Sequence, residues 1–145
     1  MLSIDPGKHR CAIALLASDG HLLDLTWQPS LARIPVALRS YGGPVVVEGQ
    51  YAGRAGGSMA AVSMAAGMVV GQMLRRSALY VVPTSTWTRN VAKTERQQVS
   101  LSRMTERELE MLGAACPSKQ HNLVDAIDLG RWALRQGDLS RWEWR

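Results

Sequence analysis

Four acidic side chains of this chain stand among residues of buried type. Asp5 closes the run MLSID and Glu48 closes PVVVE, while Asp125 and Asp128 lie one helical turn apart in LVDAIDL. A buried carboxylate is unfavourable unless a cation or hydrogen bonds compensate it. If the four converge, their mutual repulsion prevents all of them from ionising without a bound metal. Such oxygen ligands suit Mg²⁺ or Mn²⁺.

Each acid also has a purely structural interpretation. Asp5-Pro6-Gly7 is a common type of surface turn. Glu48 could pair with an arginine, and a D-x-x-D pair is often a solvated helix face. The two aspartates do, however, point in the same direction, because residues three apart share one helix face. A single metal site would explain all of these acids together, so we favour it.

The elements that must position the acids follow from hydrophobic runs and turn signals. The pattern predicts strands at 2–5, 11–16, 21–27, 45–48 and 78–82, and helices at 57–76, 104–115 and 121–137. Shorter helices are expected within 29–41 and 84–92, with Thr84 and Ser85 suited to cap the second of these. Thr105 is the expected cap of the helix at 104–115, residues 93–103 form a polar and basic segment, and the C-terminal tail has no assignment. Short turns join the first three strands into an antiparallel meander. We therefore expect an α/β fold whose mixed five-stranded sheet adds two parallel strands to this meander and is flanked by helices.

Length and composition are typical of one globular domain covering residues 1–145. Cys11 and Cys116 lie in unrelated contexts, which disfavours a zinc site and indicates reduced thiols in a cytosol. No signal peptide is expected. The uncharged stretch 55–74 is about long enough to span a bilayer, but its Ala, Gly, Ser and Met content favours a buried or subunit-contacting helix.

The net charge of +5 favours an anionic partner. Three of the seventeen basic residues are Lys, and the other fourteen are Arg. The planar guanidinium group suits phosphate oxygens better than a point charge does. A nucleic acid is the expected partner if a phosphodiester chemistry is present.

The acidic motifs together resemble those of the RuvC family of Holliday-junction resolvases. The pieces IDPG, VVVEG and DAID occur in the family's order, and the likeness spans Leu2 to Leu134. The resemblance implies the RNase H-like fold and a structure-selective endonuclease that cuts four-way DNA junctions, leaving 5′-phosphate and 3′-hydroxyl ends. It also implies that Asp5 bridges two Mg²⁺ or Mn²⁺ ions, with Glu48, Asp125 and Asp128 completing their coordination.

The resemblance further implies DNA contacts and a homodimer. Tyr51 lies three residues after Glu48, where the family places an aromatic that stacks on bases at the junction centre. The other expected DNA contacts are basic: Lys8, Arg10, Arg54, Arg89, Lys93, Arg96 and Arg103. The long helix at 57–76 resembles the family's dimer element, although core packing also explains its small residues.

Some features depart from the family or leave alternatives open. Relatives often carry Thr-Gly at the second strand, where this chain has Cys11-Ala12. The short length is typical of a compact, phage-type relative. His121 precedes Asp125 by one turn and could assist a metal site, or have no special role. Two other interpretations stay open: a nuclease for flaps or other branched DNA, including a terminase-type enzyme, and a junction-binding protein that does not cut. An actin-like ATPase needs two such domains and is disfavoured.

Overall fold

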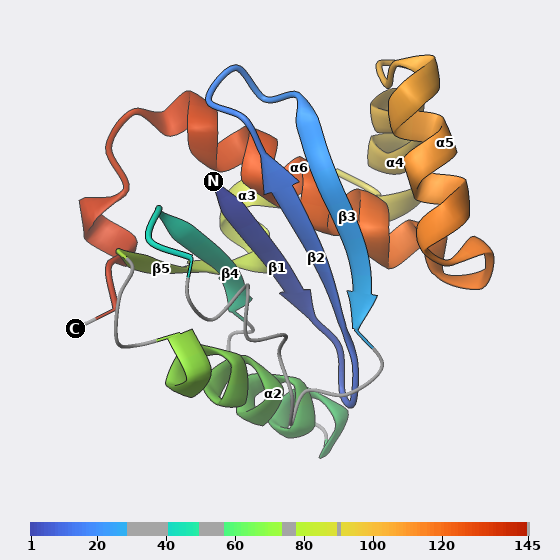
Figure 1. The fold of residues 1–145 in the computed structure, drawn as a ribbon. Helices are drawn as coiled ribbons and strands as arrows, with labels where there is room; N and C mark the ends of the chain where they lie inside the picture. The colour runs from blue at the N-terminus through green and yellow to red at the C-terminus, as the bar shows by residue number, and fades with distance from the viewer. Residues whose placement is uncertain (29–40, 50–56, 74–77, 90, 145) are drawn as a thin grey trace.

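One mixed sheet with helices on both faces forms the centre of the computed structural model (Figure 1). The structure describes residues 1–28, 41–49, 57–73, 78–89 and 91–144. Within them the strand order is β3-β2-β1-β4-β5. The strands are β1 (Leu2–Pro6), β2 (Cys11–Leu16), β3 (Leu22–Gln28), β4 (Val45–Gly49) and β5 (Leu79–Pro83).

The strand pairing is the one expected from the sequence. β2 pairs antiparallel with both β1 and β3, while β4 pairs parallel with β1 and β5. The turn from β2 to β3 contains Gly20 at φ 90°, a left-handed conformation that suits glycine. Gly7 instead has no such angle, and its amide donates to the Arg10 carbonyl (2.8 Å) to close the β1–β2 turn. The predicted α/β fold is confirmed.

Alternation along the strands divides the core between the two faces of the sheet. In β1, Leu2 and Ile4 pack toward helix α2 (Gly57–Met73), and Ser3 faces helix α6 (Gln120–Gln136). In β4, Val45 and Val47 pack on the α2 side, whereas Val46 packs with the α6 core. Successive side chains of a strand point to opposite faces. The side chains of Asp5 and Glu48 therefore project toward α6.

Helix α6 lies unusually close to the sheet at Gly130. A Cβ atom added there would lie 2.1 Å from Leu16 Cδ1 and 2.9 Å from Ser3 Cβ. The absence of a side chain at position 130 thus allows the helix to touch β1 and β2 directly. This close approach determines how near the acids of α6 come to the ends of the strands.

Three shorter helices complete the α6 side: α3 (Thr84–Thr88), α4 (Lys93–Leu101) and α5 (Glu106–Ala115). Thr105 caps α5 as expected, in a reciprocal capping box with Glu108. Glu108 is buried and also accepts hydrogen bonds from the Leu22 amide (3.0 Å) and from Arg131 Nη2 (2.6 Å). One carboxylate thereby joins α5 to β3 and α6. Single 3₁₀ turns lie at Pro117–Lys119 and Ser140–Trp142.

Several details differ from the sequence-based expectation. Residues 93–101 form the helix α4, whereas we expected only a polar basic segment. The first turn of α3 has Pro83 at its N-cap and no side-chain cap, so Thr84 and Ser85 do not cap it. The C-terminal tail, which had no assignment, pairs with the edge strand β5 through Tyr80 and Glu143. The helix expected within 29–41 lies outside the described residues, except for Tyr41.

Helix α2 packs one side on the sheet through Ala65, Ala66, Val69, Val70 and Met73. Met64 and Met68 on the same helix are 70% and 47% exposed. In the part of the chain that the structure describes, no helix combines the length and apolar character that crossing a bilayer requires.

The contact at Gly130 gives a test of the fold. Gly130→Ala is expected to lower the free energy of unfolding by about 1–3 kcal/mol, because the added methyl group must displace Ser3 and Leu16 in a packed core. Gly113→Ala in α5 is the matched control, since a Cβ there meets nothing within 4 Å. That control should be neutral or stabilising by up to about 1 kcal/mol, owing to better helix propensity. Urea denaturation of both variants measures the difference, and equal stabilities would contradict the close packing.

Candidate active site

Asp5 and Glu48 are neighbours at the carboxyl ends of two parallel strands. The register pairs Ile4 of β1 with Val47 of β4. Asp5 and Glu48 are the next residues of these two strands. Both side chains face α6, as the alternation of their strands requires. They line one pocket of about 380 Å³ together with Asp125 of α6. Three of the four acids selected from the sequence are therefore brought together.

The crowding of these acids changes the protonation of Asp5. Removal from water, then the charge of Glu48 and a hydrogen bond to Glu48, raise the pKa of Asp5 well above its ordinary value. The charge of Asp125 acts in the same direction, and that of Lys93 opposes it. Without a compensating ion, the ionised form of Asp5 is thus disfavoured beside Glu48. Trp87 Nε1 donates to the buried Glu48 carboxylate (3.2 Å) and fixes it from the other side.

Asp125 is neutralised by two cations from α4. Lys93 Nζ lies 2.5 Å from its Oδ2, and Arg96 Nη1 lies 2.9 Å from its Oδ1. Gln97 Nε2 donates to the same Oδ1 (3.2 Å). Because the Asp125 side chain is only 6% exposed, these pairs are screened less than surface ion pairs are. They also hold α4 against α6.

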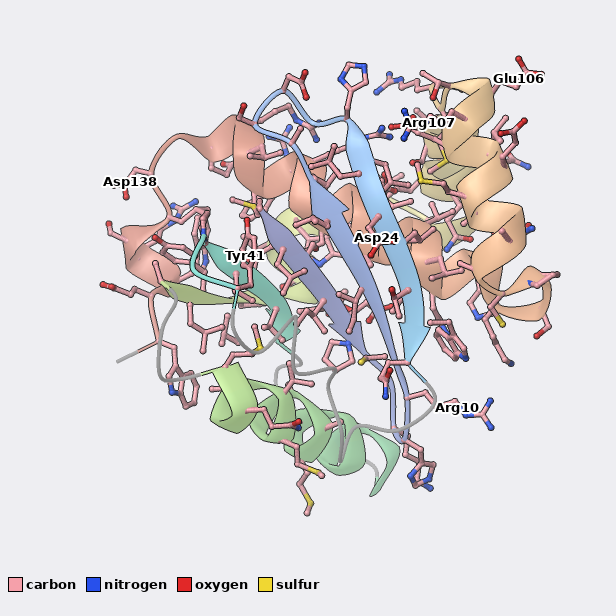
Figure 2. All side chains as sticks on the ribbon, viewed as in Figure 1. Arg10, Asp24, Tyr41, Glu106, Arg107 and Asp138 are labelled. Atoms are coloured by element: carbon pink, nitrogen blue, oxygen red, sulfur yellow. The ribbon has the colours of Figure 1, made fainter. Side chains whose placement is uncertain are left out.

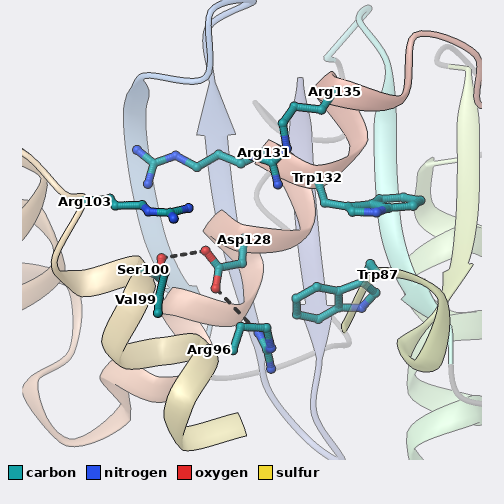
Figure 3. Close-up of a pocket in the computed structure, with 9 residues that line it drawn as sticks. All are labelled: Trp87, Arg96, Val99, Ser100, Arg103, Asp128, Arg131, Trp132 and Arg135. Atoms are coloured by element: carbon teal, nitrogen blue, oxygen red, sulfur yellow. Dashed lines mark hydrogen bonds and ion pairs between the residues drawn. The ribbon is translucent and has the colours of Figure 1, made fainter. Parts of the chain in front are cut away.

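Asp128 belongs to the next pocket along the helix. It accepts a hydrogen bond from Ser100 Oγ (2.6 Å), and its Oδ2 lies 3.5 Å from Arg96 Nη1 (Figure 3). Burial raises the pKa of Asp128, although Ser100 and Arg96 act against this shift. Arg96 therefore stands between the two helical aspartates. The fourth selected acid lies near the other three but does not line their pocket.

The carboxylate pocket has the chemistry of a site for a hard divalent cation, although its ligands are not in position. Among the described residues, no group of three or more acidic, histidine or cysteine side chains is arranged to hold a metal ion. The reason is local: Lys93 and Arg96 occupy the oxygens of Asp125, and Asp5 and Glu48 are hydrogen-bonded to each other. Thr84 Oγ1, which lines the same pocket, is buried and has no hydrogen-bond partner. The oxygen donors fit Mg²⁺ or Mn²⁺ once Asp125 exchanges its cations for the ion.

The basic residues expected to contact DNA surround the carboxylate pocket unevenly. Lys93 and Arg96 line it. Lys8 and Arg10 lie on the exposed β1–β2 turn, where Arg10 extends away from the sheet (Figure 2). Arg89 ends α3 with φ 51°, and Arg103 is exposed after α4. Tyr51 and Arg54 lie outside the described residues.

Sequence analysis missed several residues at the site. Thr84, Thr88 and Asn122 line the carboxylate pocket, Trp87 holds Glu48, and Ser100 holds Asp128. The two threonines lie in α3, which follows β5 directly, and the carboxyl ends of parallel strands share one sheet edge, so their position was a usable signal. Asn122 and Ser100 carried no such signal. The His121 side chain is exposed and its backbone carbonyl accepts from Gln97 Nε2 (2.9 Å), so it does not line the pocket.

Comparisons with known proteins identify the fold. No protein-family model matches the sequence, and no curated protein matches it. Among solved structures, Thermus thermophilus RuvC in complex with a Holliday junction substrate superposes with a TM-score of 0.58 at 18% identity, covering 94% of this chain and 95% of that one. A second structure of T. thermophilus RuvC has the same coverage, with a TM-score of 0.45 and 16% identity. The chain therefore has a RuvC-like arrangement of the RNase H-like fold.

The raised pKa of Asp5 predicts a stability gain when its carboxyl group is replaced by an amide. A raised folded-state pKa means that the unfolded chain ionises first, so the penalty is absent below the unfolded pKa of about 4 and grows as the pH rises toward the folded pKa. In metal-free buffer near pH 8, Asp5→Asn is expected to raise the free energy of unfolding by more than about 1 kcal/mol, because the amide avoids the cost of ionising a buried carboxyl group.

Urea denaturation at about pH 8 and about pH 4 in chelator measures this effect. The gain should shrink toward the lower pH, because Asp5 of the unfolded chain becomes protonated as the pH falls through about 4. Asp24→Asn is the matched control, because Asp24 is an exposed residue of β3 (Figure 2). A gain that is the same at both pH values, or that also occurs in the control, would contradict the raised pKa.

Proposed function

We propose that this chain is a metal-dependent endonuclease that cuts branched DNA and resolves four-way junctions. The observation that carries the proposal is the placement of Asp5, Glu48 and Asp125 around one pocket at the carboxyl edge of an RNase H-like sheet. The fold neighbour with the TM-score of 0.58 was solved with a Holliday junction substrate. The arginine-rich composition suits a phosphate backbone.

The residues of the pocket divide the work between holding an ion and holding the substrate. Asp5, Glu48 and Asp125 would hold Mg²⁺ or Mn²⁺, and Asp128 would join them if two ions bind. When bound, such ions activate a water molecule and stabilise the leaving 3′ oxygen, so that the products carry 5′-phosphate and 3′-hydroxyl ends.

The other residues of the pocket orient these groups. Trp87 keeps the Glu48 carboxylate in place through its indole N–H. Lys93 and Arg96, once separated from Asp125, are free to bind the phosphate oxygens of the strand.

Resolution of a four-way junction requires two cuts, which two copies of the chain would supply. The exposed methionines of α2, Met64 and Met68, offer an apolar surface for such a homodimer. The expected setting is the cytosol of a bacterium or of a phage-infected cell, where branched DNA arises.

Cleavage of a labelled four-way junction tests the proposal. With Mg²⁺ or Mn²⁺ the protein is expected to produce paired, symmetric nicks, and chelator should abolish them. Asp5→Asn and Asp125→Asn should each lower the cleavage rate by more than the roughly 10- to 100-fold that loss of an outer metal partner costs. Junction binding should persist in Asp5→Asn, because the change leaves every phosphate-binding group in place.

Asp24→Asn is again the matched control and should cut at the wild-type rate. A panel with flaps, replication forks and linear duplexes separates the alternatives: cleavage of flaps in preference to four-way junctions would assign a flap or terminase-type nuclease. Cleavage by Asp5→Asn at the wild-type rate would show that Asp5 is not part of the active site.

A specific observation favours a second candidate, a junction-binding protein that does not cut. Asp125 already has Lys93 and Arg96 as partners at 2.5 and 2.9 Å, so its charge is compensated without a metal. In this case the acids stabilise the contact between α4 and α6, and the basic residues bind DNA. The proposal of a nuclease and this alternative make opposite predictions about divalent ions.

Thermal unfolding with added Mn²⁺ distinguishes the two. A bound ion at ten times its Kd stabilises the folded state by about 1.4 kcal/mol, a rise in Tm of about 3–6 °C for a chain of this size. We expect this rise in the wild type and in Asp24→Asn, and its loss in Asp5→Asn and Asp125→Asn. No rise in the wild type, together with junction binding but no cleavage, would favour the non-cutting protein.

A further inference from the structure

A second pocket lies along α6, next to the carboxylate pocket. Its volume is about 290 Å³, near the lower end of the range for small-ligand sites. Figure 3 shows that side chains from α3, α4, the α4–α5 connection and α6 converge on it. Four of its lining residues are arginines and two are tryptophans: Arg96, Arg103, Arg131, Arg135, Trp87 and Trp132.

This pocket is lined by more arginines than acidic residues. Arg96 pairs with Asp125 and Asp128, and Arg131 pairs with Glu108 (2.6 Å). Arg103 and Arg135, both exposed, have no ion pair within the described part of the chain. Two guanidinium groups thus face one pocket without a counter-charge, an arrangement that attracts an anion.

The other two arginines are held in place before any ligand binds. Arg131 is anchored at both ends of its guanidinium group, since Nε donates to the Gly20 carbonyl (3.1 Å) and Nη2 to Glu108. Arg96 stacks over the ring of Trp87, 4.3 Å from its centroid, and its Nε is buried without a hydrogen-bond partner. Fixed donors lose little freedom on binding, which favours affinity.

The position of the pocket relates it to the carboxylate pocket. Arg96 lines both pockets. On α6, Arg131 and Arg135 follow Asp125 by six and ten residues. At a rise of 1.5 Å per residue these offsets are about 9 and 15 Å along the helix axis. A strand that ran along α6 would therefore reach these arginines a few nucleotides from the carboxylate pocket, since a duplex rises about 3.4 Å per nucleotide.

We propose that this arginine pocket binds a backbone phosphate of the substrate strand, a few nucleotides from the bond that is cut. Arg103 and Arg135 bind the phosphate oxygens, and Arg131 is a positioning residue, held at the wall of the pocket by Glu108 and the Gly20 carbonyl. The indole rings of Trp87 and Trp132, each 6% exposed, form an apolar wall beside the anion. The inference rests on the proposed function for its substrate, but binding alone can test it.

Fluorescence anisotropy with a labelled four-way junction, measured in chelator so that no cleavage occurs, tests this pocket. The Arg103→Ala/Arg135→Ala double variant is expected to bind about tenfold or more weakly, because its charge-assisted hydrogen bonds to phosphate are absent. Its plot of log affinity against log salt should be shallower by about one for each phosphate that the variant no longer binds. The variant Arg107→Ala/Arg141→Ala is the matched control: it removes the same charge from exposed residues that line none of the pockets described above. It should keep most of the affinity.

Each possible result of these binding measurements either supports or contradicts the proposed phosphate site. If both double variants bind the junction equally weakly, the proposed phosphate site is wrong, because the loss of affinity then depends on net charge alone. Wild-type affinity and salt dependence in Arg103→Ala/Arg135→Ala would overturn it as well. Titration with inorganic phosphate distinguishes a nucleic-acid strand from a free anion as the ligand of this pocket. If inorganic phosphate binds the pocket without competing with the junction, the assignment to a strand is wrong. None of these outcomes depends on cleavage, so failure of the nuclease assay alone leaves the binding result intact.

Discussion

The repulsion between Asp5 and Glu48 is the interaction around which the rest of this edge of the protein is arranged. Parallel pairing of β1 with β4 sets the two carboxylates side by side, and strand alternation turns both toward α6. Burial strengthens the repulsion, because less water screens the charges. The structure relieves it through the hydrogen bond between Asp5 and Glu48, which accompanies the raised pKa of Asp5, and through the indole hydrogen bond to Glu48. A divalent cation would relieve it more fully.

The packing of α6 brings the third carboxylate to this edge. Gly130 lets the helix touch the sheet at Ser3 and Leu16, and Asp125 lies five residues earlier, near the carboxyl ends of the strands. The ion pairs from Asp125 to Lys93 and Arg96 then attach α4 to α6. Breaking a buried ion pair leaves an uncompensated charge, so these contacts also favour the native arrangement of the two helices. The same residues thus contribute to packing and to the electrostatics of the site.

Arg96 connects the two pockets, because it contacts both aspartates of α6 and stacks on Trp87, which in turn holds Glu48. A single guanidinium group therefore compensates acids that an ion would otherwise compensate, and it lies where a phosphate would approach. If an ion replaces Arg96 and Lys93 at Asp125, the N–H groups of both side chains become available to the substrate. Such an exchange of partners would be a chemical reason for placing cations beside these acids.

The sequence by itself determined the strands, the long helices and the cap at Thr105, and it selected the four acids as candidate metal ligands. It could do so because these features depend on local periodicity, turn residues and the cost of isolated buried charge. It also indicated an anionic partner through the arginine content. Only the tertiary structure decided which acids share a pocket. Asp125 and Asp128 are equivalent in spacing, yet one meets Lys93 and the other meets Ser100, since α4 packs across α6 between them. The arginine pocket likewise joins Arg103 with Arg131 and Arg135, residues that are distant in sequence, and no local pattern reports how two helices cross.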